Sequence, residues 1–385
     1  MKPTAFSPTR GTACLCGLLL GALPVAGAVP SVGELEALDL TELSPWTWSG
    51  SVRAAGGYKD NVELSAFAPV GSAFARAEAE FFGWRLPEEG ESEVQLFGAA
   101  TLTRYTERTS GQSEAQWFGR AEVSRVVASG WSVTGSLEGF QLDQFLDLSA
   151  TEAERFAAKL QATGGSAAVA LRREAGRGVW FEVRPSCKRE TYRDGIADAW
   201  QPAAKATLGR RWAEGRGEIS LGWQAERHDF DDRRQFSLRG FAMPDTALEF
   251  RRQEADLRFT WQAGPERKWR WVSVLIGQRN RDNGPGYFDY EYTALKQEIH
   301  WRGAAWRARI TGRIGRYDYS HRPVSTALGA PVWRKDEQLV ECRLERRLGP
   351  GWVVFAEYSG ERSDATNPNA SFRVNTAWLG VEWMR

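Results

Sequence analysis

The sequence predicts an all-β protein: a transmembrane, antiparallel, up-and-down β-barrel of about 16 strands, within a range of about 14 to 18. Three observations predict it, namely strict polar–apolar alternation, connections that alternate between short and long, and tryptophans gathered beside the short connections. Near residue 220, Ile219, Leu221 and Trp223 alternate with polar residues. Period two marks a strand with one apolar and one polar face.

The first 28 residues have the features of a secretory signal peptide. Lys2 and Arg10 are positive, an apolar run follows, and Ala26 to Ala28 has the small-x-small form of a cleavage site. A membrane anchor is the alternative, but the apolar run is short and broken by glycine. We therefore expect a signal peptide at 1–28, a short periplasmic lead at 29–45 and the barrel at 46–385.

Alternating segments follow one another along the rest of the chain. Each is long enough for a tilted membrane strand of about 9–11 residues. The alternation is weakest in the segment 155–175. The segments start near residues 46, 72, 93, 115, 131, 155, 178, 198, 217, 247, 268, 290, 305, 335, 351 and 371.

The connections between these segments also alternate. Short breaks such as 128–130 and 302–305 are rich in glycine, which suits tight hairpins. Longer polar stretches lie between them, at 229–247, 280–292 and 319–336. Outer-membrane barrels have short periplasmic turns and long extracellular loops, and the sequence predicts the same arrangement here.

Tryptophan is abundant, with 18 residues, and many lie near a short turn on the apolar face. Amphipathic aromatic rings favour the headgroup level of a membrane. A soluble aromatic core, the alternative, would not gather them at one rim. The predicted membrane girdle consists of Trp48, Trp131, Trp212, Trp261, Trp301, Trp306, Trp352 and Trp383.

The opposite face of the strands carries many charges. Burial of so many ions in a dry core would cost more than folding could recover, so we expect them to line water or to form salt bridges across it. The predicted pore-lining residues are Arg76, Glu78, Glu80, Arg120, Glu122, Glu182, Arg184, Glu218, Glu226, Arg252, Glu254, Arg258, Lys296, Glu298, Arg307, Arg309, Arg313, Glu337, Glu341 and Arg343.

Composition argues against several functions. The 49 acidic and 50 basic residues balance, whereas a nucleic-acid partner needs a basic excess. No spacing of His or Cys indicates a metal or a cofactor, so neither is expected. His228 with Asp229, Asp231 or Asp232 could activate water, but such clusters are more often solvated charges. We therefore expect no enzyme and no catalytic residue.

Signal peptide, alternating hairpins, aromatic girdle and a C-terminal strand rich in aromatic residues together resemble a Gram-negative outer-membrane barrel of the porin class. The resemblance spans about residues 46–385 and rests on architecture. It implies contact with outer-membrane lipid and lipopolysaccharide and insertion by the barrel-assembly machinery, and it allows a homo-oligomer. Such barrels commonly end in an aromatic residue, whereas here Met384 and Arg385 follow Trp383.

The favoured function is a channel for passive diffusion of small hydrophilic solutes, selected by size and charge. Two alternatives stay open: a secretion or assembly barrel that exports a protein or polysaccharide with a periplasmic partner, and a closed structural or adhesive barrel. The loop 229–247 is the expected pore constriction. Its candidate residues are Asp231, Asp232, Arg233, Arg234 and Arg239.

Overall fold

The computed structural model describes residues 46–87, 92–107, 112–150, 152, 156–193 and 198–385. The expected signal peptide and periplasmic lead lie outside these residues and stay predictions. Among the described residues, no helix has the length and apolar character needed to cross a membrane. The only helical segments described are three short 3-10 turns: η2 (Ala213–Gly215), η3 (Pro265–Arg267) and η4 (Pro368–Ala370).

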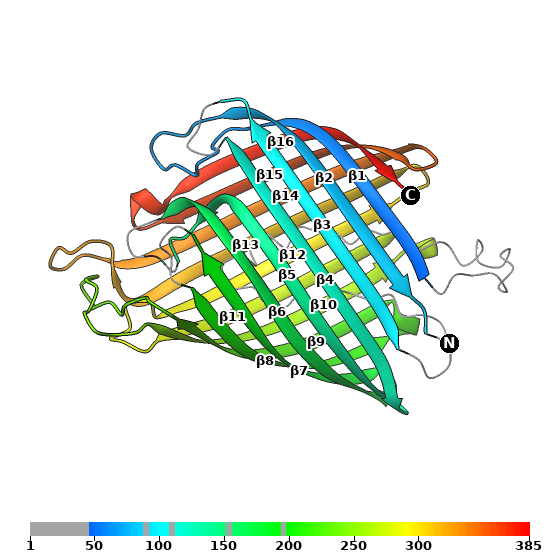
Figure 1. Cartoon of the computed structure of the whole chain (residues 1–385), viewed down its shortest axis with the longest axis horizontal. Coiled ribbons are helices and arrows are strands. Elements are labelled where there is room, and N and C mark those ends of the chain that lie inside the picture. Colours follow the sequence, from blue (N-terminus) through cyan, green and yellow to red (C-terminus); the bar gives the residue numbers. More distant parts are fainter. Residues whose placement is uncertain (1–45, 88–91, 108–111, 151, 153–155, 194–197) are drawn as a thin grey trace, which may run out of the picture. The chain divides into compact units, whose positions relative to one another are not determined.

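Strands make up nearly all of the described chain (Figure 1). They are β1 (Trp46–Lys59), β2 (Ser72–Arg85), β3 (Glu93–Tyr105), β4 (Ser113–Ala128), β5 (Trp131–Asp147), β6 (Ala157–Gly176), β7 (Val179–Tyr192), β8 (Ala199–Trp212), β9 (Gly217–Phe230), β10 (Glu249–Ala263), β11 (Trp269–Asp282), β12 (Tyr290–Arg302), β13 (Trp306–Pro323), β14 (Val332–Gly349), β15 (Trp352–Ala365) and β16 (Phe372–Met384).

These strands form one closed barrel in which each strand pairs antiparallel with its neighbours in sequence, and β1 pairs with β16. The predicted fold class is therefore confirmed. Closure leaves no strand edge with unpaired backbone amides. The β1–β16 seam is a short ladder that runs from Ser51 paired with Met384 to Lys59 paired with Thr376.

The observed strand starts lie close to the predicted ones, including that of the irregular β6. The largest difference concerns the predicted loop 319–336: β13 continues to Pro323 and β14 begins at Val332, so the connection is shorter than expected. Alternation is hard to read there because Tyr317, Tyr319 and Trp333 are aromatic and yet lie on the same face as charged residues. The long loops lie at one end of the barrel and the tight turns at the other (Figure 1).

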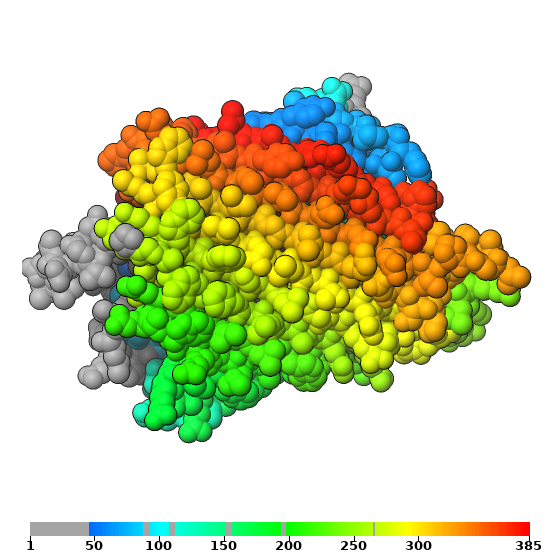
Figure 2. Space-filling model, turned by 180° about the vertical axis from the view of Figure 1, so that it is seen from behind, coloured from blue at the N-terminus to red at the C-terminus, as the bar shows by residue number. Residues whose placement is uncertain are grey.

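Burial alternates along each strand, but with apolar residues on the outside. On β9, Leu221 is 56% exposed and Trp223 49%, whereas Glu226 and His228 are buried. The outer surface of β8–β16 is a continuous wall (Figure 2). Soluble proteins bury large apolar side chains and expose charged ones. This barrel has the reverse arrangement, with large apolar side chains outside and charges inside.

Inside the barrel, the end with the long loops is packed with aromatic side chains. One cluster joins β12, β13 and β14, and another joins β9, β10 and the β11–β12 loop. The two clusters contain, in order, Tyr290, Tyr292, Tyr317, Tyr319 and Trp333, and then Phe230, Leu248, Phe250, Tyr287 and Phe288.

Candidate functional site

The barrel interior gathers the charged side chains predicted from the sequence. Every predicted pore-lining residue has the inward parity of its strand, and all of them are buried or half-buried. Glu78 and Glu80 on β2, for example, alternate with outward alanines. Since successive side chains point to opposite faces, the strand pairing alone places these residues around one enclosed space.

A tight ionic cluster spans the β1–β16 seam. Arg53 of β1 donates to Glu80 at 2.8 Å and to Glu78 at 3.1 Å, and its Nε lies 3.0 Å from Glu382 of β16. Arg53 and Glu382 were not among the sequence predictions. The inward face of β1 otherwise carries few charges. The sequence did contain a signal for Arg53, because it stands between the apolar residues Val52 and Ala54, which face outward.

Arg343 of β14 extends the same cluster. Its guanidinium lies 2.6 Å from Glu345, 3.0 Å from Glu357 of β15 and 3.2 Å from Glu382. Glu382 thus joins Arg53 of β1 to Arg343 of β14 across three strand boundaries. Most charges in this part of the wall are compensated by a partner.

The arginines of β13 are held less closely. Arg309 lies 3.9 Å from Glu357 and Arg313 lies 3.7 Å from Glu337. Arg307 has no ion pair among the described residues. The inward face of β13 therefore carries a group of weakly compensated arginines.

The described residues of the β5–β6 connection reach the opposite wall. In a ring of sixteen strands, β5 and β13 lie eight positions apart, which is the largest separation the ring allows. Arg322 of β13 is fully buried and donates to the carbonyl oxygens of Ser149 and Glu152, both at 2.7 Å. Tyr319 donates to the Ala150 carbonyl at 2.7 Å. This connection therefore crosses the interior.

Two further contacts fix the ends of the same connection. The Lys335 ammonium of β14 lies 2.5 Å from Asp147, where β5 ends, and 2.7 Å from Glu337. Where β6 begins, the ring of Phe156 packs 5.4 Å from that of Trp333. Polar donors and an aromatic contact thus anchor it at several points.

The candidate residues of the predicted constriction loop differ in exposure. Asp231, Asp232, Arg234 and Arg239 are exposed. Asp231 accepts hydrogen bonds from Arg189, which keeps its carboxyl pKa below the usual value. Only Arg233 turns inward: burial lowers its pKa, and it lies 3.1 Å from Glu152. Loop 229–247 thus touches the β5–β6 connection through Arg233, and its role as a constriction stays a prediction.

The tryptophans of the predicted girdle lie on outward positions near the short turns. Trp48 and Trp352 are more than half exposed. Trp48 covers Gly83 so closely that a Cβ there would lie 2.3 Å from its ring, an arrangement in which an aromatic ring shields a strand glycine. Trp180, in contrast, faces inward and is buried.

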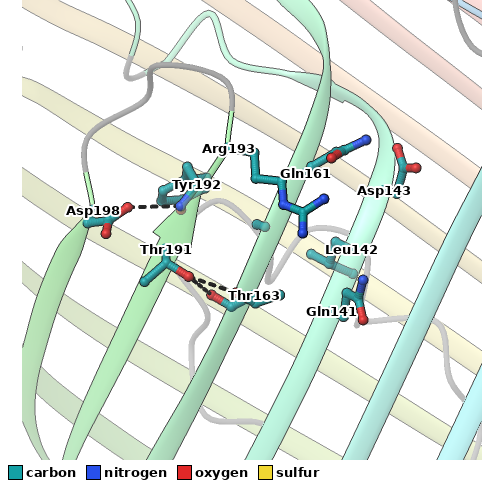
Figure 3. A pocket seen from close by; sticks show the side chains of 10 residues that line it. Gln141, Leu142, Asp143, Gln161, Thr163, Thr191, Tyr192, Arg193 and Asp198 are labelled. Atoms are coloured by element: carbon teal, nitrogen blue, oxygen red, sulfur yellow. Dashed lines mark hydrogen bonds between the residues drawn. The ribbon is translucent and has the colours of Figure 1, made fainter.

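A cavity of about 310 Å³ opens where β5, β6 and β7 approach the long loops (Figure 3). Thr163 and Thr191 bond to each other there at 2.7 Å, and Asp198 accepts from the backbone of Tyr192. Gln141 and Thr163 are outward residues, so the outer surface has become polar at this height.

The catalytic alternative is not assembled in the described residues. His228 is buried, stacks on Phe230 at 4.2 Å and approaches Gln201 at 3.4 Å. Asp229 instead pairs with Arg227. Within the part of the chain that the structure describes, no group of three His, Cys, Asp or Glu residues could hold a metal ion.

No known family model and no curated protein matches this chain. Among solved structures it is similar to OmpT of Vibrio cholerae, with 11% identity, 88% of this chain and 97% of that chain covered, and a TM-score of 0.45. It is similar to OccAB3 of Acinetobacter baumannii, with 9% identity, 88% of this chain and 99% of that chain covered, and a TM-score of 0.47. It is also similar to an anion-selective porin from Comamonas acidovorans, with 9% identity, 88% of this chain and 99% of that chain covered, and a TM-score of 0.45. The fold assignment depends on the strand pairing described above.

Proposed function

We propose that this chain is an outer-membrane channel through which small hydrophilic solutes diffuse passively. One observation carries the proposal: a closed ring of sixteen strands has an apolar outer surface and an ionic interior. In hydrocarbon each backbone amide needs a partner within the sheet, which a closed barrel supplies. The ionic interior needs water.

The width of the ring supports an aqueous passage. Sixteen strands spaced about 4.8 Å apart and tilted by about 40° enclose a backbone cylinder roughly 30 Å across. Barrels of this strand number leave an aqueous channel, because one layer of side chains from the wall does not fill them. The β5–β6 connection and the aromatic clusters narrow this passage near the long loops.

A closed structural barrel is the second candidate, because the same connection and clusters occupy the interior near the long loops. Planar bilayers separate the two functions. We expect purified full-length protein to give steady, ohmic conductance steps. A correctly folded barrel that inserts and remains silent would contradict the channel and favour the closed barrel.

The charge preference of the channel should depend on β13. We expect the triple substitution Arg307→Glu, Arg309→Glu and Arg313→Glu to shift the reversal potential toward cation preference, because these three inward arginines lie on one strand and are only weakly compensated. Reversal potentials in a salt gradient measure this. The matched control replaces the outward residues Arg316, Arg334 and Arg362 by Glu, and an equal shift in the control would contradict the selectivity.

A further inference from the structure

The end of the barrel with the short turns carries exposed arginines without acidic partners. Four of them have outward parity and stand a few residues before a turn: Arg125, Arg173, Arg210 and Arg346. All four are exposed, and none has an ion-pair partner among the described residues. They occur on β4, β6, β8 and β14, so this basic rim extends around much of the barrel.

Two of the four arginines repeat one arrangement with a girdle tryptophan. Arg173 is the register partner of Trp131, and its guanidinium carbon lies 5.1 Å from the ring centre. Arg346 is the register partner of Trp306, at 5.3 Å. Because the indole ring favours the headgroup level, it places the guanidinium at the depth of the lipid phosphates.

Three outward arginines near the long loops have acidic partners, whereas Arg104, Arg279 and Arg373 at the same end have no ion pair among the described residues. Arg316 lies 2.6 Å from Asp336, Arg334 lies 2.6 Å from Asp318, and Arg362 lies 2.7 Å from Asp364. Each of these arginines already has a carboxylate partner within the protein. The four rim arginines have no acidic partner among the described residues, and two of them contact a girdle tryptophan instead.

We propose that the basic rim, Arg125, Arg173, Arg210 and Arg346, binds the phosphate headgroups of anionic phospholipids in the leaflet on the short-turn side. This rests on the proposed membrane function, which puts the apolar band in lipid. Guanidinium groups pair well with phosphate oxygens, and a basic residue near an anionic membrane surface binds more tightly through charge attraction. An acidic protein would need the same charge, but the stacked tryptophans favour a lipid.

The test uses purified full-length barrel in nanodiscs of phosphatidylcholine, with and without a minority of phosphatidylglycerol. Native mass spectrometry counts the retained phosphatidylglycerol relative to phosphatidylcholine. We expect the variant with Arg125, Arg173, Arg210 and Arg346 replaced by Gln to lose this preference, by a factor of about five at each site. The control variant R316Q, R334Q and R362Q should keep it.

Salt should weaken the preference of the parent protein, because exposed charges are screened. An unchanged preference in the rim variant, or an equal loss in the control variant, would overturn the proposal. Retention of added polyglutamate in place of phosphatidylglycerol would also overturn it, in favour of an acidic protein partner. A barrel that prefers phosphatidylglycerol through these arginines but does not conduct would leave this proposal standing and contradict only the channel.

Discussion

Replacement of Arg53 by Met is expected to lower the free energy of unfolding of the barrel by about 3–5 kcal/mol, the usual cost of removing one partner from a buried ion pair. Arg53 is 7% exposed and contacts three carboxylates where the two ends of the sheet meet. Few other side chains in the barrel combine this burial with this many charged partners.

The cost comes mainly from one carboxylate. Without Arg53, Glu78 keeps Arg76 at 2.5 Å and Glu382 keeps Arg343 at 3.2 Å. Glu80 has no other ion pair among the described residues, so it becomes an uncompensated charge in a half-buried site. The seam that it adjoins is the place where the barrel closes.

Urea unfolding followed by tryptophan fluorescence, together with the heat-dependent shift in gel mobility, measures the effect. The double variant Arg53→Met with Glu80→Leu should recover part of the lost stability, since it removes the orphaned charge as well. Arg316→Met is the control: Arg316 is exposed and paired only at the surface, so its loss should have little effect. Equal destabilisation by both single variants would show that the seam cluster has no special role.

Sequence alternation was sufficient to predict the strands, their inward faces and the barrel class, because a period of two has the same meaning wherever a sheet has one apolar side. It could not identify ion-pair partners. Arg343 reaches Glu382 across β15, and that contact depends on strand tilt and register and not on spacing along the chain.

The inward connection was missed for a related reason. Loop 229–247 was predicted to be the constriction because it is long and charged. In the structure its Phe236 stacks on Tyr287 of the neighbouring β11–β12 loop, with ring centres 5.6 Å apart. The β5–β6 connection is anchored through the backbone oxygens of Ser149 and Ala150, which carry no charge signal in a sequence. The informative residue was Arg322, an arginine among the aromatic residues of β13 and β14.

The substitution Arg322→Ala should release the β5–β6 connection from the opposite wall and raise the single-channel conductance. Each hydrogen bond from a charged group to a buried partner contributes about 1.5–3 kcal/mol. Arg322 makes two of them, so their loss favours the released state by a factor of about a hundred or more. Its guanidinium also stacks 4.1 Å from the Trp333 ring, and that contact disappears too.

Planar-bilayer recordings measure the conductance, and unchanged heat-dependent gel mobility shows that the variant barrel is folded. The matched control is Arg334→Ala, an exposed outward arginine of β14 whose partner is Asp318. Lys335→Met, which removes the contact with Asp147 from the same side, should change the conductance in the same direction as Arg322→Ala. Folded Arg322→Ala and Lys335→Met barrels that both keep the conductance of the parent would contradict the prediction that this connection limits the passage.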